Sequence, residues 1–159
     1  MIFLKNKTSP ITDQLTSKLF DEKTFYRTFT EDLLNSKKEV IIESPFISSS
    51  RMRTLTPIFK KVIERGVKVY IFTRDPKDQG DSLEIQSEQE ITKFEAMGIQ
   101  VLLCLGNHHR KLAILDRKIL WEGSLNILSQ VKSREIMRRI DSEELTMQML
   151  NFLKLAKFL

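Results

Sequence analysis

The sequence predicts an α/β fold, in which a mixed, largely parallel β-sheet is flanked by helices on both faces. Short apolar runs rich in valine and isoleucine alternate with longer segments whose apolar residues recur every three or four positions. In the first half of the chain this alternation indicates right-handed strand–helix–strand crossovers, which place strands parallel. Two later apolar runs follow each other closely, so hairpins make the sheet mixed.

Four helices are expected from this periodicity. The first follows Asp21 as its N-cap, because apolar side chains then recur at four-residue spacing. The other three span residues 51–65, begin at a capping box in residues 87–90, and follow Asp141. Pro57 lies inside the second helix, so its regular part either starts at Thr56 or is kinked there.

Six short apolar runs are expected to be strands, at residues 39–43, 67–72, 99–105, 111–115, 118–121 and 134–140. Pro76 and Gly80, set among charged residues, indicate a loop over residues 73–81. Residues 21–159 are expected to form one domain, a usual size for a single core. Residues 1–20 are expected to be an N-terminal extension, because the chain begins without periodicity.

The composition favours an anionic partner, since the chain carries a formal net charge of +5. A single cysteine, Cys104, excludes an internal disulfide bond and a cysteine-rich zinc site. No apolar run reaches the roughly 18 residues that a membrane span needs. The apolar start is too short for a signal peptide. We therefore expect a cytoplasmic protein without stable membrane association.

The most specific pattern is H-x-K-x4-D-x6-G-S-x-N. Its members are His109, Lys111, Asp116, Gly123, Ser124 and Asn126. Phosphodiester transfer requires a nucleophile, an acid for the leaving oxygen and positive groups for the phosphoryl oxygens. Imidazole is a nucleophile or an acid near neutral pH, lysine supplies a compact charge, and amides add donors. The pattern therefore indicates phosphate chemistry.

Strand geometry predicts how these side chains are arranged. Residues 111–115 read as a strand, so His109 and Lys111 are expected to point together, roughly 7 Å apart. Asp116 falls on the opposite face and is expected to orient other groups or form a salt bridge rather than touch phosphate. His108 and His109, the two histidines of the chain, would face opposite ways. They are not expected to serve as nucleophile and acid for one phosphate.

The motif resembles the signature of the phospholipase D superfamily, whose members cleave or transfer phosphodiesters through a phosphohistidine. The resemblance extends over residues 20–155 and implies the phospholipase D-like fold, without a metal ion or cofactor. The catalytic residues that it implies are His109, Lys111, Asp116, Ser124, Asn126 and Glu135. Glu135 is similar to the family's acidic residue that hydrogen-bonds the catalytic imidazole. The expected phosphate- or substrate-binding residues are Lys111, Gly123, Ser124, Asn126, Arg110 and Arg134.

One copy of the motif has a consequence for assembly. Family members with a single copy resemble half-enzymes that pair two protomers, each donating one histidine. We therefore predict a homodimer in which both His109 side chains meet at a shared site. One imidazole attacks phosphorus and the other protonates the leaving group.

The motif indicates the reaction more clearly than the substrate. Short single-motif members mostly resemble endonucleases, and the surroundings of this motif are similar to nuclease domains attached to bacterial helicases and restriction systems. The first hypothesis is thus a metal-independent nuclease acting on DNA, with RNA left open and a helicase or restriction system as partner. A phospholipase-like or transphosphatidylase enzyme is the second hypothesis. The third is a dimeric nucleic-acid-binding module with little catalysis.

Overall fold

A seven-stranded mixed sheet forms the centre of the computed structural model, which describes residues 16–130 and 132–159. Its strands are β1 (Thr16–Asp21), β2 (Glu39–Glu43), β3 (Lys68–Arg74), β4 (Gln100–Cys104), β5 (Leu112–Leu115), β6 (Ile119–Gly123) and β7 (Ile136–Asp141). The helices are α1 (Phe25–Asn35), α2 (Ser49–Glu64), α3 (Asp81–Ala96) and α4 (Glu143–Phe152), with short 3₁₀ helices η1 (Pro76–Asp78) and η2 (Leu155–Phe158). Within the described residues, no helix is both long and apolar enough to cross a membrane.

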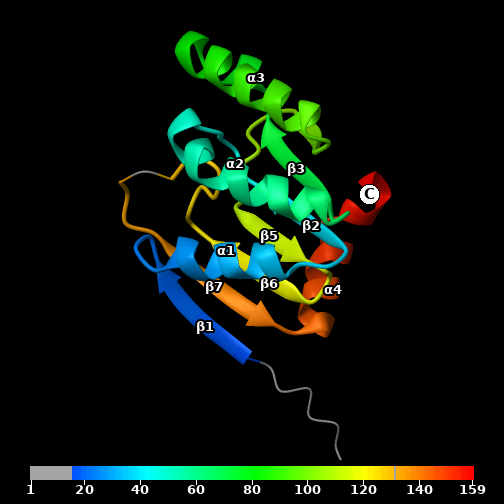
Figure 1. Cartoon of the computed structure of the whole chain (residues 1–159). Helices are drawn as coiled ribbons and strands as arrows, with labels where there is room; N and C mark the ends of the chain where they lie inside the picture. Colours follow the sequence, from blue (N-terminus) through cyan, green and yellow to red (C-terminus); the bar gives the residue numbers. More distant parts are fainter. Residues whose placement is uncertain (1–15, 131) are drawn as a thin grey trace, which may run out of the picture.

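The strands are ordered β1-β7-β6-β5-β2-β3-β4. The predicted mixed sheet with helices on both faces is confirmed, but the sheet is not largely parallel. The pairs β2–β3 and β3–β4 are parallel, and the other four pairs of neighbouring strands are antiparallel. The connection from β4 to β5 is too short for a helical crossover, so β5 returns antiparallel beside β2. As a result, the carboxyl ends of β2, β3 and β4 and the start of β5 share one edge of the sheet (Figure 1).

The core has two layers, one on each face of the sheet. Apolar side chains of α1, α2 and α3 cover one face, and those of α4 and η2 cover the other. Alternate strand residues supply the two layers, as Ile41 and Ile42 of β2 illustrate. Both layers are therefore organised by the same strands that end at the shared edge.

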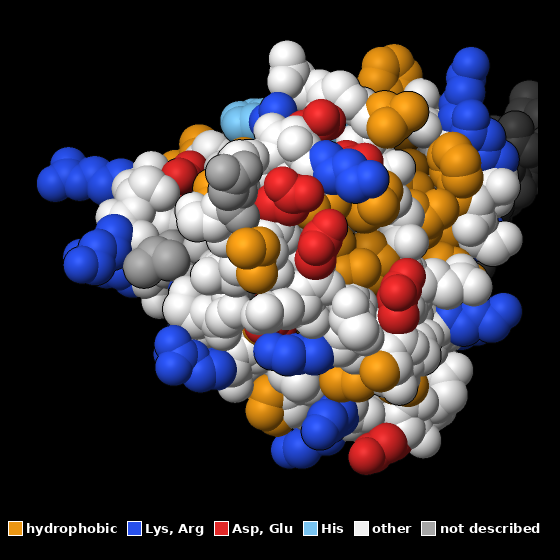
Figure 2. All heavy atoms as spheres, turned by 90° about the horizontal axis from the view of Figure 1, so that it is seen from above, with side chains coloured by type: hydrophobic (Ala, Val, Ile, Leu, Met, Phe, Trp, Pro, Cys, Tyr) orange, Lys and Arg blue, Asp and Glu red, His pale blue; other side chains and the backbone are white. Residues whose placement is uncertain are grey.

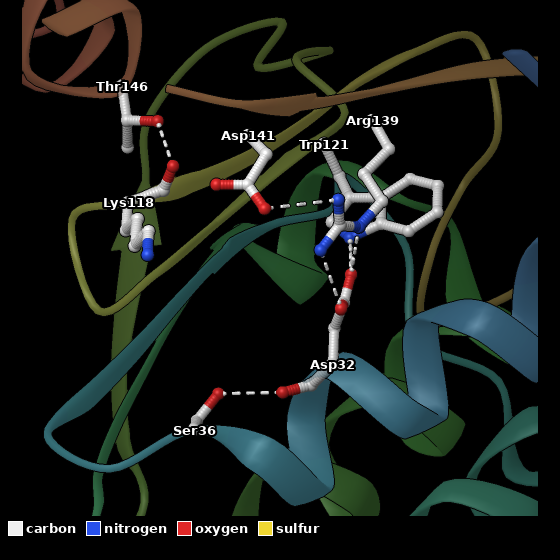
Figure 3. A network of polar contacts seen from close by, with 7 residues as sticks. All are labelled: Asp32, Ser36, Lys118, Trp121, Arg139, Asp141 and Thr146. Carbon is white, nitrogen blue, oxygen red and sulfur yellow. Dashed lines mark hydrogen bonds and ion pairs between the residues drawn. The ribbon is translucent and has the colours of Figure 1, made fainter. Parts of the chain in front are cut away.

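A buried polar network fastens α1 to β6 and β7. The Asp32 carboxylate accepts hydrogen bonds from Trp121 Nε1 at 2.8 Å and from Arg139 Nε at 2.7 Å and Nη2 at 3.0 Å (Figure 3). Trp121 is completely buried, and its ring meets those of Phe25 and Phe29 edge-on. Burying a carboxylate costs free energy unless the carboxylate is paired, so Asp32 depends on its hydrogen bonds to Trp121 and Arg139.

Three details differ from the sequence predictions. Residues 16–20, assigned to the N-terminal extension, belong to edge strand β1, which pairs with β7; residues 1–15 lie outside the described part. Helix α2 begins at Ser49, so of the two alternatives given for Pro57 the start at Thr56 is wrong. The predicted capping box is wrong, because α3 starts at Asp81 and the Ser87 hydroxyl bonds Gln79 instead.

Replacing Asp32 tests the network. Asp32→Ala leaves Trp121 Nε1 without its acceptor and leaves Arg139 with the longer ion pair to Asp141 at 3.6 Å, so we expect the free energy of unfolding to fall by about 3–5 kcal/mol. Urea denaturation followed by tryptophan fluorescence measures this change. Glu31→Ala, on the exposed side of the same turn, is the control and should change stability little. A loss below about 1 kcal/mol for Asp32→Ala would show that α1 is held by apolar packing alone.

Candidate active site

His109 and Lys111 come together just before β5 begins. Lys111 Nζ lies 2.8 Å from His109 Nδ1 and 3.4 Å from Nε2, and it donates to the His109 carbonyl at 2.9 Å. A lysine ammonium has only donors, so the nearer ring nitrogen is the acceptor in this hydrogen bond. Partial burial lowers the pKa of Lys111, and the Glu135 carboxylate opposes that shift. The pair offers an acceptor ring nitrogen beside a cation.

His108 lies apart from this pair. Its side chain is 7% exposed, and its Nε2 is 3.8 Å from Oε2 of the fully buried Glu43. Burial, followed by the positive charge of Arg110, lowers the pKa of His108. The two neighbouring imidazoles therefore have separate environments, one inside the protein and one at its surface.

The Gly-Ser turn follows β6 and packs directly against β7. A Cβ atom on Gly123 would lie 2.2 Å from the Ile136 carbonyl oxygen and 2.9 Å from Met137 Cα, so only glycine permits this approach. The Ser124 N–H then donates to the Ile136 carbonyl at 2.9 Å. The turn is thereby fixed against the start of β7.

Glu135 is held by hydroxyl groups. Its carboxylate accepts hydrogen bonds from Ser124 Oγ and, at 2.7 Å, from Ser133 Oγ. The sequence predicted a bond to the catalytic imidazole, whereas the contacts of the His109 ring shown here are to Lys111. The negative charge of Glu135 favours the protonated form of Lys111, because it raises the pKa that burial lowers.

The side-chain oxygen of Asn126 is an acceptor for which the described residues provide no donor. Its Oδ1 is buried and has no hydrogen-bond partner among the described residues. Its carbonyl oxygen accepts from the N–H groups of Ser129 and Gln130, which fixes the backbone. A buried amide oxygen in this state is costly, which suits a residue that meets a ligand.

The two arginines predicted to bind substrate differ in their surroundings. Arg110 Nε donates to Glu43 Oε2 at 2.5 Å, although nearly half of the arginine side chain stays exposed. Arg134 is exposed on the loop before β7. Arg110 is therefore anchored, while Arg134 has the freedom of a surface side chain.

An open groove of about 450 Å³ is lined by four of the predicted site residues, His109, Arg110, Lys111 and Gly123, whereas Ser124, Asn126, Arg134 and Glu135 are not among its lining residues. Glu122 and Arg138 also line it. Leu19 and Ile136 form an apolar rim and are 60% and 65% exposed. Sequence reasoning missed Glu43, Glu122 and Arg138 as neighbours of the site. One feature of the sequence could have indicated Glu43, because it is a carboxylate at the end of a strand whose preceding residues are apolar.

Metal-binding groups were also sought around this groove. Across residues 16–130 and 132–159, no three His, Cys, Asp or Glu side chains lie close enough together to hold a metal ion.

Comparison with protein families agrees with this geometry. The family model described as cardiolipin synthase, PLD-like domain, matches residues 29–155. The chain belongs to this PLD-like family. No curated protein sequence matches the chain.

Solved structures share the fold of this PLD-like domain. NucT from Helicobacter pylori superimposes with a TM-score of 0.71 at 20% identity, over 89% of this chain and 94% of that one. Nuc from Salmonella typhimurium, a phospholipase D family member, gives 0.69 at 17% identity, over 89% and 93%. Phosphatidylserine synthase from Haemophilus influenzae Rd KW20 gives 0.72 at 17% identity, over 89% of this chain but 38% of that one.

Asp116 lies at the opposite end of β5 from the groove. It occupies a left-handed turn with φ 53°, and its carboxylate accepts from the backbone N–H groups of Lys37, Lys38 and Glu39 at 2.8–3.0 Å. Its own N–H donates to the Glu39 carbonyl at 2.9 Å. In this PLD-like domain the motif aspartate therefore joins the β5–β6 turn to the start of β2, away from His109.

Replacing Asp116 separates this structural role from a chemical one. Asp116→Ala removes the acceptor for three N–H groups and strains the left-handed turn, so the free energy of unfolding should fall by about 2–4 kcal/mol. Asp116→Asn keeps one acceptor and tolerates the turn, and should lose less. Urea denaturation measures both variants. Loss of activity in Asp116→Ala with unchanged stability would instead place the carboxylate in the chemistry.

Proposed function

We propose that this PLD-like domain is a metal-independent endonuclease that cleaves DNA through a phosphohistidine on His109. The observation that carries the proposal is the contact between His109 and Lys111 in an open groove. A neutral imidazole beside a cation is suited to attack a phosphodiester, because the cation stabilises the charge that develops on the phosphoryl oxygens.

The proposed reaction has two steps. A ring nitrogen of His109 forms a bond to phosphorus, and the bond to the leaving oxygen breaks as that oxygen takes a proton from an acid. Water then attacks the phosphohistidine, losing its proton to the same group and releasing His109. Lys111 shifts from the imidazole to the phosphoryl oxygens.

We further propose that the acid is His109 of a second copy of the chain. The one other imidazole, His108, is buried against Glu43 and is not directed at the groove. Leu19 and Ile136 lie beside His109 as exposed apolar side chains, which a second protomer would cover. The match spans 94% of NucT and 93% of Nuc but 38% of phosphatidylserine synthase.

Charge favours nucleic acid as the substrate. The groove and its surroundings carry Arg110, Lys111 and Arg138, with exposed Arg134 on the adjoining loop. The face seen from above in Figure 2 differs, since acidic side chains lie over its centre and most lysines and arginines stand around its outline. A polyanion is therefore expected to approach the groove rather than the outer face of α3.

A nuclease assay with chelator tests the reaction. Labelled DNA and RNA are incubated with the protein in EDTA, and cleavage of DNA should persist because no step uses a metal ion. His109→Ala should lower the rate at least ~10³-fold by removing the nucleophile. Lys60→Ala, an exposed lysine of α2, is the control and should match wild type. Cleavage that requires Mg²⁺ would contradict the mechanism, and headgroup release from phospholipid vesicles with DNA intact would assign a lipid substrate.

Subunit mixing tests the shared site. Wild type and His109→Ala are unfolded together in equal amounts and refolded, so that dimers form at random. If each site needs both imidazoles, about one quarter of the wild-type activity should remain, because only wild-type pairs are active. Independent sites in each protomer would retain about one half. Sedimentation velocity on the same sample should show a dimer, and a monomer would exclude the shared site.

A further inference from the structure

Glu43 is a buried charge that the proposed reaction does not use. It closes β2 at the edge where β5 begins, and its side chain is completely buried. Burial raises the pKa of its carboxyl group, while the neighbouring Arg110 opposes that shift. A carboxylate in such a place is destabilising unless a partner compensates it, so its contacts indicate what it holds.

Those contacts are with the two residues that flank His109. Arg110 Nε donates to Glu43 Oε2 at 2.5 Å, and His108 Nε2 lies 3.8 Å from the same oxygen. Successive side chains therefore alternate: His108 and Arg110 point to Glu43, and His109 points to Lys111. The carboxylate therefore holds the segment through Arg110, whereas the buried His108 Nε2 lies beyond hydrogen-bond distance and has no hydrogen-bond partner among the described residues.

The strand pairing adds a third restraint. Glu43 pairs with Leu112, the first residue of β5, in the antiparallel register of β2 and β5. The segment before Leu112 also contains a positive-φ turn at Gly106, whose carbonyl accepts the His108 N–H at 2.9 Å. The segment from 108 to 111 is thus fixed at its end by the sheet and at Arg110 by Glu43.

Charge compensation is a second effect of the same contact. Arg110 and Lys111 are neighbouring cations on the groove, and Glu43 neutralises the first of them. The other charged groups that line or influence the groove are Glu122, Glu135 and Arg138. Without Glu43 an uncompensated guanidinium would stand beside the imidazole and disfavour its protonated form.

We propose that Glu43 is a positioning residue for His109, which it orients by holding the side chain of the next residue, Arg110. The inference rests on the proposed function, in that it takes His109 to be the nucleophile. Glu43 itself touches neither phosphate nor the reacting atoms.

The test uses E43Q, R110Q and the double variant E43Q/R110Q. E39Q is the matched control, because Glu39 stands at the other end of β2 and pairs with Arg117 as Glu43 pairs with Arg110. The substrate is the labelled DNA of the nuclease assay, and amide hydrogen exchange is followed by NMR on the same samples without substrate.

In E43Q, kcat should fall between about 10- and 100-fold while KM stays within about threefold, because the nucleophile is misplaced and phosphate contacts remain. Exchange of the amides of residues 108–111 should rise at least about tenfold, with β3 unchanged. The alkaline limb of the pH–rate profile should move to lower pH, since the uncompensated Arg110 disfavours the imidazolium. E39Q should behave as wild type in all three measurements.

The double variant distinguishes positioning from a general structural role. E43Q/R110Q removes both charges, so the alkaline limb should return toward wild type and the loss of kcat should be smaller than the product of the two single losses. If E43Q does not fold, R110Q and the double variant still test this coupling, because R110Q should move the limb in the opposite direction. Unchanged exchange at residues 108–111 in the folded variants, or single losses that simply multiply, would overturn the proposal. If wild type does not cleave the substrate, the proposed function fails, and the exchange data alone decide on Glu43.

Discussion

The antiparallel seam between β2 and β5 is the constraint on which the site depends. It joins the parallel part of the sheet to the antiparallel part. Its register decides where the segment containing His109 enters β5. A slip of one residue would turn every side chain of β5 to the other face. Polar contacts secure the seam at both ends, with Asp116 bound to the backbone at the start of β2 and Glu43 bound to Arg110 at its end.

This arrangement divides the motif between structure and chemistry. Asp116 and Gly123 shape the backbone, the first through a clamped turn and the second through a close strand contact. His109 and Lys111 face the groove and can react. Behind them, the Asp32 network keeps α1 on β6 and β7, so the strands that carry the Gly-Ser turn and Glu135 are fixed relative to each other.

Much of the fold could be predicted because buried strands have strong patterns. Strand β2, for example, has four buried residues in succession and coincides with its predicted bounds. Strand β1 was missed because it is an edge strand with five of its six residues exposed, so it has no apolar alternation. The start of α3 was misplaced because its first turns carry mixed charged and apolar residues, and Ser87 bonds outside the helix.

The site was predictable to the extent that its residues are adjacent in sequence. His109 and Lys111 are two apart, and local geometry alone brings them together. The contacts of Glu135 were less predictable. Its carboxylate accepts hydrogen bonds from Ser133, two residues away, and from Ser124, which lies close to it because β6 and β7 pair. Glu43 is far from His109 in sequence, and only the sheet places the two side by side.

The bare backbone at Gly123 has a consequence for how this domain can vary. Even one methyl group there would meet the neighbouring strand, and the displacement would pass to Ser124 and to the loop bearing Glu135. A position without any reactive atom is therefore as intolerant of substitution as the nucleophile. In this part of the molecule, sequence freedom is limited by the space between two main chains as much as by the demands of bond cleavage.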